Sequence, residues 1–246
     1  MSLATFVHDA AATWQAGDTV ILDGSEGRHA ASVRRIRVGE QIALTDGRGA
    51  TAVVTVTELG KSSITGTVDS LGVREPEAPR VTVVQAIPKG ERGELAVEML
   101  TEVGVDVIVP WAAERSVAVW KGDRATKSLA KWRSTAREAA KQARRSWFPE
   151  VTEVASTADV AALLAGAGVR VVLHEAASGP LADIPIPGRA EIVIVVGPEG
   201  GITEQELAAF AAVGAEPMRM GTSVLRSSTA GVAAAAALLS RTPRWR

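Results

Sequence analysis

The stretch IVIVVGPEGGITEQELAAF, residues 192–210, decides how the larger part of this chain folds. It starts as a continuous apolar run, which is typical of a strand buried on both faces of a sheet. The run breaks at Gly-Pro-Glu-Gly-Gly, and a helical pattern begins at about Thr203. A buried strand that leads through a glycine turn into a helix indicates an α/β domain.

Other segments after residue 80 alternate in the same way. Apolar strands are predicted at residues 81–87, 105–110 and 169–175, with a helix before Gly104 and an alanine-rich helix at 227–240. Strands that are apolar throughout, separated by helices, predict a parallel sheet with helices on both faces.

The first 70 residues have a different sequence pattern. Short β-branched stretches follow one another closely, with Asp-Gly turns between them, and they predict a small all-β barrel. Two prolines and mixed charges at residues 70–80 indicate a boundary. We therefore expect one domain over residues 1–72 and a second over residues 78–246.

Composition excludes several kinds of protein. The chain has 246 residues, of which 46% are hydrophobic, so a sizeable buried core is expected. It has no cysteine, which excludes disulfides, thiolate metal sites and cysteine nucleophiles. No apolar run approaches the roughly 20 residues needed to cross a bilayer, and no secretory leader is recognisable. We expect a cytoplasmic protein without a metal site or membrane partner.

One segment is strongly basic although the formal net charge is only −1. Residues 121–145 hold nine lysines and arginines against two acids. The spacing of the apolar residues predicts a helix over 126–146 with one buried stripe, formed by Leu129, Trp132, Ala136, Ala139 and Ala143. The basic faces are either solvated or bind a polyanion such as RNA.

The predicted RNA-binding residues come from two places. Lys131, Arg137, Lys141 and Arg145 lie on the basic segment, and Arg28, Arg34, Arg35 and Arg37 cluster in the N-terminal region. Surface arginines on a small domain also serve solubility, so both interpretations stay open at this point.

The glycine turn is a predicted ligand site, because ligands of parallel sheets bind beyond the carboxyl ends of the strands. Phosphate is a poor fit, since Glu199 lies in the turn and Glu204 and Glu206 follow it. A neutral or cationic small molecule fits better, and a purely structural turn is the alternative. Arg226 enters an apolar neighbourhood either in an ion pair or as a ligand contact.

Three motifs then carry a resemblance: LHE at 173–175, VGPEGGIT at 196–203 and LRSSTA at 225–230. Residues 29–49, 88–117 and 131–151 extend it over nearly the whole chain. Together they closely resemble the 16S ribosomal RNA uridine-N3 methyltransferases of the SPOUT class.

The resemblance implies a fold and a set of partners. The fold would be a small PUA-like β-barrel followed by a SPOUT-type α/β domain with a parallel sheet and a deep trefoil knot. The cofactor would be S-adenosylmethionine. The partners would be 16S rRNA within the small ribosomal subunit and a second copy of the chain in a homodimer.

The resemblance also implies the site residues. The cofactor shell would be Leu173, His174, Glu175, Gly197, Glu199, Gly200, Gly201, Met220, Leu225, Arg226, Ser227, Ser228 and Ala230. Arg226 is our candidate catalytic residue, because a cation near the uridine oxygens would stabilise the uridine anion. Glu98, Glu102 and Glu138 are candidates for the base. The family often has a glutamate where this chain has Ser228, and we interpret that position as one that does not supply the base.

Three other functions are weighed against this one. A different SPOUT activity, such as ribose 2′-O methylation, is disfavoured by the upstream motifs. A non-catalytic RNA-binding ribosome-assembly factor is disfavoured by the complete set of cofactor motifs. A nucleotide hydrolase is disfavoured because the sequence has no Walker A motif.

Overall fold

A computed structural model describes residues 3–245 and divides the chain into two compact units. The first unit runs to Pro76 and includes residues 140–148, and the second holds residues 77–139 and everything from Pro149 onward. The break after Pro76 falls inside the proline-containing segment where the sequence predicts a boundary. The return of residues 140–148 to the first unit is not foreseen from the sequence.

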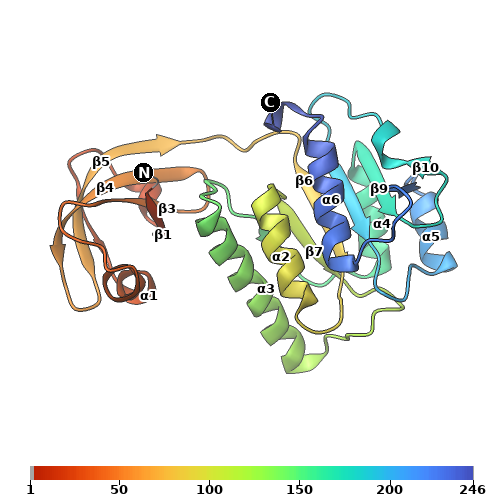
Figure 1. The fold of residues 1–246 in the computed structure, drawn as a ribbon, viewed down its shortest axis with the longest axis horizontal. Coiled ribbons are helices and arrows are strands. Elements are labelled where there is room, and N and C mark those ends of the chain that lie inside the picture. Colours follow the sequence, from red (N-terminus) through yellow and green to blue (C-terminus); the bar gives the residue numbers. More distant parts are fainter. Residues whose placement is uncertain (1–2, 246) are drawn as a thin grey trace. The chain divides into compact units, whose positions relative to one another are not determined.

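The first unit is built on a five-stranded sheet (Figure 1). Its strands lie in the order β1-β3-β4-β5-β2, and only the β1–β3 pair is parallel. A short helix, α1 (Gly24–Arg28), continues into a π-helical turn at His29–Val33, and a single 3-10 turn lies at Ala11–Thr13. The strand bounds are β1 Ala4–Val7, β2 Thr19–Leu22, β3 Gln41–Thr45, β4 Ala50–Leu59 and β5 Ile64–Val73.

The alternation of side chains along β4 shows how this sheet makes a core. Ala52, Val54 and Val56 are buried, whereas Thr51 and Val53 are partly exposed. Successive residues of a strand point to opposite faces, so the buried set faces Phe6 and the other apolar residues of this unit. The predicted small all-β domain is confirmed.

The second unit has a seven-stranded sheet in which every pairing is parallel. The strand order is β10-β12-β9-β11-β6-β7-β8, so β11 lies between β6 and β9. The strands are β6 Val81–Ala86, β7 Val107–Trp111, β8 Glu150–Val151, β9 Val169–Leu173, β10 Gly179–Pro180, β11 Ile192–Val196 and β12 Glu216–Arg219. The apolar runs at 81–87, 169–175 and 192–196 contain β6, β9 and β11, as predicted, and the run at 105–110 covers all of β7 except Trp111.

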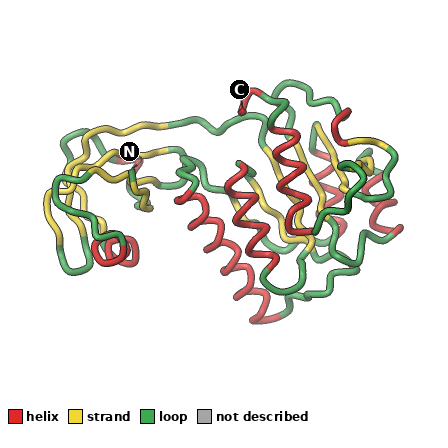
Figure 2. The backbone as a smooth tube through the Cα atoms, in the orientation of Figure 1, coloured by secondary structure: helices red, strands yellow, loops and turns green. Residues whose placement is uncertain are grey.

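Helices cover both faces of this sheet, as the tube in Figure 2 also shows. Leu100, Trp132 and Leu238, from α2, α3 and α6, belong to the core on one face. Leu164 and Phe210, from α4 and α5, belong to the core on the other. The helix bounds are α2 Arg92–Val103, α3 Gly122–Gln142, α4 Thr157–Gly166, α5 Glu204–Ala211 and α6 Ser227–Leu239, with 3-10 turns at Leu181–Asp183 and Pro243–Trp245. The predicted parallel sheet with helices on both faces is confirmed.

The basic helix α3 follows its predicted stripe except at the end. Leu129, Trp132, Ala136 and Ala139 are buried, but Ala143 is exposed, so its place in the stripe is wrong. The helix ends at Gln142, because Arg144 adopts a left-handed backbone with φ 53° and the Arg145 amide bonds back to the Ala140 carbonyl at 3.0 Å.

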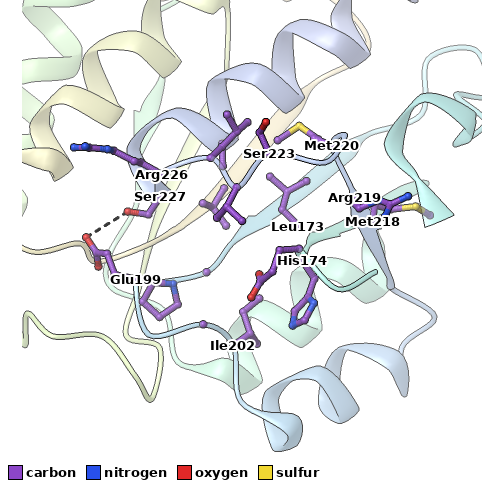
Figure 3. A pocket seen from close by; sticks show the side chains of 18 of the residues that line it. Leu173, His174, Glu199, Ile202, Met218, Arg219, Met220, Ser223, Arg226 and Ser227 are labelled. Carbon is purple, nitrogen blue, oxygen red and sulfur yellow. Dashed lines mark hydrogen bonds between the residues drawn. The ribbon is translucent and has the colours of Figure 1, made fainter. Parts of the chain in front are cut away.

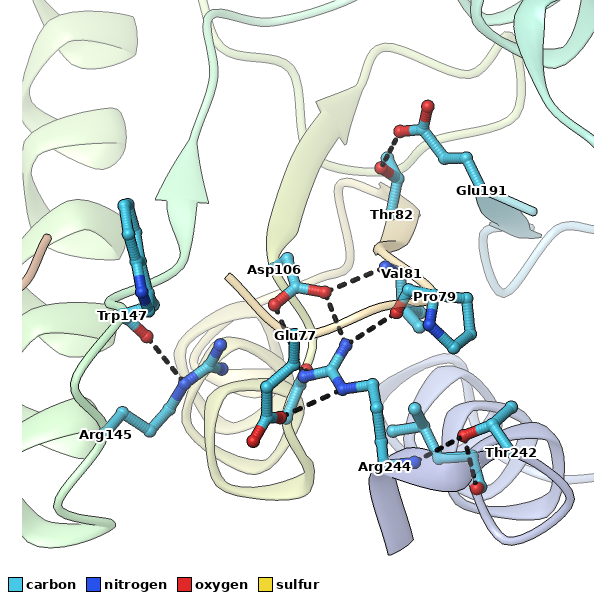
Figure 4. Close-up of polar contacts among 12 residues, drawn as sticks. Glu77, Pro79, Val81, Thr82, Asp106, Arg145, Trp147, Glu191, Thr242 and Arg244 are labelled. Carbon is cyan, nitrogen blue, oxygen red and sulfur yellow. Dashed lines mark hydrogen bonds and ion pairs between the residues drawn. The ribbon is translucent and has the colours of Figure 1, made fainter. Parts of the chain in front are cut away.

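An arginine near the C-terminus ties the second unit together (Figure 4). Arg244, whose side chain is 5% exposed, pairs with Asp106 at 2.7 Å and donates to the Pro79 carbonyl at 2.9 Å. Asp106 also accepts the Val81 amide at 2.8 Å. Because each charge has several partners, this buried pair fixes the C-terminal turn against the starts of β6 and β7.

Candidate functional site

A cavity of about 480 Å³ opens at the carboxyl ends of β9, β11 and β12, beside the N-terminus of α6 (Figure 3). Eleven of the thirteen residues predicted for the cofactor shell line it. They are Leu173, His174, Glu175, Gly197, Glu199, Gly201, Met220, Leu225, Arg226, Ser227 and Ala230. Segments more than fifty residues apart in sequence therefore meet at the edge of the sheet where parallel strands bind ligands.

The wall that follows β11, residues 197–203, is fixed by many contacts. The Gly201 amide bonds to the Pro198 carbonyl at 2.9 Å, and Gly201 has φ +76°, a conformation in which other residues are strained. Gly200 lies against Arg115, whose guanidinium donates to the Gly200 carbonyl at 3.3 Å. A Cβ added at Gly200 would approach both the Cβ and the carbonyl oxygen of Arg115 at 3.0 Å.

Gly200 thus supports the wall without lining the cavity. Ser228, the other exception among the thirteen, is 3% exposed inside the first turn of α6. Neither residue belongs to the cavity surface.

Glu206 anchors the end of the same wall. It is 3% exposed, and its carboxylate accepts the Thr203 amide and the Glu114 amide, each at 2.9 Å. The Thr203 side chain in turn accepts the Glu206 amide, which completes a capping box at the start of α5. Glu206 is therefore a structural residue, while Glu204 in the same turn is exposed.

The opposite wall runs from Met218 to Arg226 and is open. Residues 221–226 are all exposed, and the Val224 side chain is 78% exposed. Most residues of this wall were not predicted from the sequence, namely Met218, Arg219, Gly221, Thr222, Ser223 and Val224. The available signal was position alone, since these residues come shortly before the LRSSTA motif.

The end of β9 supplies the floor between the two walls. The His174 amide bonds to the Met218 carbonyl at 3.0 Å, which joins the LHE motif to β12. Its ring Nδ1 accepts the Ala176 amide at 3.2 Å. The backbone of this motif is therefore held on both sides.

Glu199 stands at the rim. Its Oε1 accepts a hydrogen bond from the Ser227 hydroxyl at 3.5 Å and lies 3.5 Å from a guanidinium nitrogen of Arg92. The dashed line in Figure 3 marks the contact with Ser227. Arg92 lines the cavity from α2 and was also missed by the sequence analysis.

Arg226 is the N-terminal flanking residue of α6 and is exposed. Figure 3 shows its guanidinium extending away from Met218 and His174. Among residues 3–245 it makes no ion pair, so the structural ion pair considered from the sequence is not formed.

The three carboxylates suggested as bases lie elsewhere. Glu98 and Glu102 are exposed residues of α2, Glu138 is an exposed residue of α3, and none of them lines the cavity. The carboxylates that do line it are Glu175 and Glu199. In the described part of the chain, no group of His, Asp and Glu is placed to hold a metal ion.

The predicted RNA-binding residues are mostly accessible. Arg28, Arg34, Arg35 and Arg37 are exposed in the first unit, and Lys131 and Arg137 are exposed on α3. Lys131 pairs with Glu94 at 3.0 Å, and this carboxylate raises the pKa of Lys131. Arg145 is half-buried and donates to the Trp147 carbonyl.

Lys141 is the exception, and its assignment to the RNA-binding surface is wrong. Its side chain is 3% exposed and forms an ion pair with Glu26 at 2.8 Å. The two residues are 115 positions apart in the sequence, so the pattern of α3 alone could not show this partner. A buried charge held by a carboxylate is not available to a phosphate.

Two family models match the chain. Residues 75–239 match an RNA methyltransferase domain, and residues 22–69 match an RNA methyltransferase PUA domain. A ribosomal RNA small subunit methyltransferase E from Mycobacterium bovis is 45% identical, over 93% of this chain and 89% of its own. The protein of that name from Bacillus subtilis is 28% identical, over 89% of each chain.

Solved structures agree with the sequence comparisons. A ribosomal RNA small subunit methyltransferase E from Neisseria gonorrhoeae, solved with S-adenosylmethionine, is 30% identical with a TM-score of 0.87 over 98% of each chain. A methyltransferase from Legionella pneumophila, solved with the same cofactor, is 25% identical with a TM-score of 0.89 over 98% of this chain and 99% of its own. On the strength of both matched domains and this identity over nearly its whole length, the chain belongs to the ribosomal RNA small subunit methyltransferase E family.

Proposed function

We propose that this protein uses S-adenosylmethionine to methylate N3 of a uridine in the 16S rRNA of the small ribosomal subunit. The observation that carries the proposal is the cavity itself, where three motifs distant in sequence form one surface in a chain that belongs to this family. Relatives of similar fold were solved with this cofactor bound.

The cavity fits the cofactor in size and charge. A volume of about 480 Å³ lies in the usual range for small-molecule sites. Glu175 and Glu199 bring carboxylates to the cavity, which suits a sulfonium and ammonium ligand and disfavours a phosphate. We propose that the backbone of residues 197–201 and of the LHE motif holds the adenosine part.

The chemistry needs an activated methyl group and a deprotonated uridine. When bound, S-adenosylmethionine supplies the methyl group on a sulfonium sulfur. The chain contributes by fixing the reacting groups in line, which alone accounts for a large part of such rate enhancements. We propose that Arg226, exposed at the rim, stabilises the negative charge on the uridine oxygens as N3 loses its proton.

Three further properties of the protein are proposed: its oligomeric state, the path of its chain around the cavity and its location in the cell. We propose a homodimer, as the resemblance to the SPOUT methyltransferases implies. We also propose that the chain around the cavity is threaded into a trefoil knot and that the protein acts in the cytoplasm. No helix in residues 3–245 combines the length and the apolarity that a membrane span requires.

The decisive experiment is nucleoside mass spectrometry. Small subunits from cells that lack this enzyme are incubated with the protein and S-adenosylmethionine, and the RNA is digested and analysed. We expect 3-methyluridine. Methylation of a ribose oxygen instead would assign the chain to another SPOUT activity, and absence of both cofactor binding and methylation would favour a non-catalytic RNA-binding factor.

A further inference from the structure

A second concave surface lies entirely within the first unit. This groove has a volume of about 590 Å³ and is lined by three arginines, Arg74, Arg144 and Arg145. Four residues that carry hydroxyl groups, Thr5, Thr51, Ser70 and Ser146, also line it. Among the described residues that form its surface, none is acidic.

The groove exists because residues 144–148 return to the sheet of the first unit. The Ser146 carbonyl accepts the Gly49 amide at 2.9 Å, and the Phe148 amide donates to the Gly47 carbonyl at 2.9 Å. The Trp147 indole donates to the Arg74 carbonyl at 2.7 Å. Arg145 donates to the Trp147 carbonyl at 2.9 Å, a contact drawn in Figure 4. The Arg145 side chain and the backbone of Arg74 are thus both bonded to Trp147 beside the groove.

Arg144 occupies a backbone position that does not suit it. Its φ of 53° puts it in the left-handed region just after α3, where helices usually end with glycine. Nothing in the ending of the helix calls for a guanidinium, and the Arg144 and Arg74 side chains form no ion pair among residues 3–245. Because Arg144 has a strained backbone and an exposed charged side chain, we infer that its charge has a function.

The groove includes Arg145, which was predicted from the sequence, but it is separate from the predicted N-terminal cluster of Arg28, Arg34, Arg35 and Arg37. Gly39, directly after Arg37 and Val38, bonds to the Val56 carbonyl, whereas Arg74 bonds to the Gly49 carbonyl just before β4. Val56 and Ala50 are six residues apart on one strand, a distance of about 20 Å. The two basic groups therefore lie toward opposite ends of β4.

We propose that the groove binds the sugar-phosphate backbone of an RNA strand. Guanidinium groups match phosphate oxygens geometrically, and neutralising phosphates releases counterions. Hydroxyl groups beside them offer the additional backbone contacts that orient a nucleic acid without reading its sequence. The choice of RNA as the polyanion rests on the proposed function, while the shape and charge of the groove do not.

Arg144→Gly is the sharpest variant, because it removes the charge and relieves the backbone strain together. Binding of a fluorescein-labelled twelve-nucleotide oligouridylate is measured by anisotropy over a series of salt concentrations. For Arg74→Ala combined with Arg144→Gly, we expect Kd to rise roughly tenfold at 0.1 M salt. The slope of log K against log salt should fall by about 1.4, which corresponds to two lost phosphate contacts on a single strand. The unfolding temperature of Arg144→Gly alone should stay unchanged or rise.

The control removes the same charge elsewhere. Lys61 and Arg189 are exposed and line neither the groove nor the cavity, so Lys61→Ala with Arg189→Ala tests the effect of net charge alone. An affinity loss and slope change equal to those of the groove variant would overturn the proposal.

Ser70→Glu provides an independent test, because it places a carboxylate in the groove at an exposed strand position. Ser70→Gln is the neutral partner of similar size. We expect the glutamate to weaken oligouridylate binding at least about threefold more than the glutamine. Equal effects of the two would show that no phosphate lies there.

Calorimetric titration with S-adenosylmethionine separates this proposal from the proposed function. The groove variants should bind the cofactor as the unaltered protein does, since no groove residue lines the cavity. If the unaltered protein methylates no RNA and yet the groove variants lose oligouridylate affinity, the proposed function fails and the groove stands. If methylation is found and the groove variants bind RNA normally, the groove proposal fails alone.

Discussion

The two walls of the cavity differ in how they are held. Residues 197–203 are bonded within their own turn, to Arg115 and to the buried Glu206. Residues 221–225 are exposed and make no hydrogen bond within the described chain. Hydrogen bonds therefore fix the first wall in place, whereas no hydrogen bond in the described chain holds residues 221–225 of the second wall.

This difference separates two tasks of one site. A preformed wall lowers the entropy lost when a ligand is fixed, while an open wall lets a ligand enter and leave. We infer that the first wall sets whether the cofactor binds at all and that the second responds to it. Changes in the first wall should therefore have the larger effects.

Gly200→Val should have the largest effect. The added Cβ would approach Arg115 at 3.0 Å on two atoms, one of them backbone, so either Arg115 or the wall must shift. We expect the affinity for S-adenosylmethionine, measured by calorimetry, to fall at least about a hundredfold in a folded protein. Gly166→Val is the control, because a Cβ there meets nothing within 4 Å. Retained affinity in Gly200→Val would show that this wall does not form the cofactor site.

Glu206→Ala should lower the stability of the whole second unit. It leaves the buried Thr203 amide and the Glu114 amide without their acceptor. We expect the free energy of unfolding to fall by about 2–4 kcal/mol in urea denaturation. Glu204→Ala changes an exposed carboxylate of the same turn and should stay within about 0.5 kcal/mol. Equal costs for the two would mean that the buried carboxylate does not anchor the wall.

Arg226→Ala tests the junction between the open wall and α6. Because Arg226 is exposed and unpaired in the described chain, its loss should cost little stability. We expect kcat to fall about a hundredfold while the Kd for S-adenosylmethionine changes less than about threefold. Arg219→Ala, on the same cavity from β12, is the matched arginine and should lower kcat much less. Equal losses in kcat and cofactor affinity for Arg226→Ala would remove its catalytic role.

The contrast between the fixed wall and the open wall also explains which parts of the fold and of the cavity could be predicted from the sequence. Strands β7 and β11 are apolar throughout, and β6 and β9 are mostly apolar, because both faces of the sheet are covered, and such runs are visible without a structure. The fixed wall was found through its glycines, since close approach and positive φ both restrict the residue type. Eleven of the thirteen residues predicted for the shell consequently meet at one cavity.

The wrong predictions for Lys141 and Ala143 have a common cause, which is contact between segments that are distant in the sequence. Lys141 has the spacing of a surface lysine, but Glu26, which the fold brings near, holds it in a buried ion pair. The apolar stripe of α3 stops before Ala143 because the chain turns at Arg144 toward the first sheet. The open wall gave little signal, since exposed residues such as Thr222 and Ser223 are constrained neither by packing nor by backbone geometry.

The smallest expected effect needs no substitution, because adding S-adenosylmethionine to the unaltered protein already tests the difference between the two walls. Amide hydrogen exchange reports which backbone groups are already bonded. The amides of Gly201, Thr203 and Glu206 donate within the fixed wall, so they should exchange slowly with and without S-adenosylmethionine. The amides of residues 221–225 have no acceptor in the described chain, so they should exchange fast alone and at least about tenfold slower with the cofactor. If both walls gained protection equally, the fixed wall would not be preformed, and the larger effect expected for Gly200→Val would lose its physical reason.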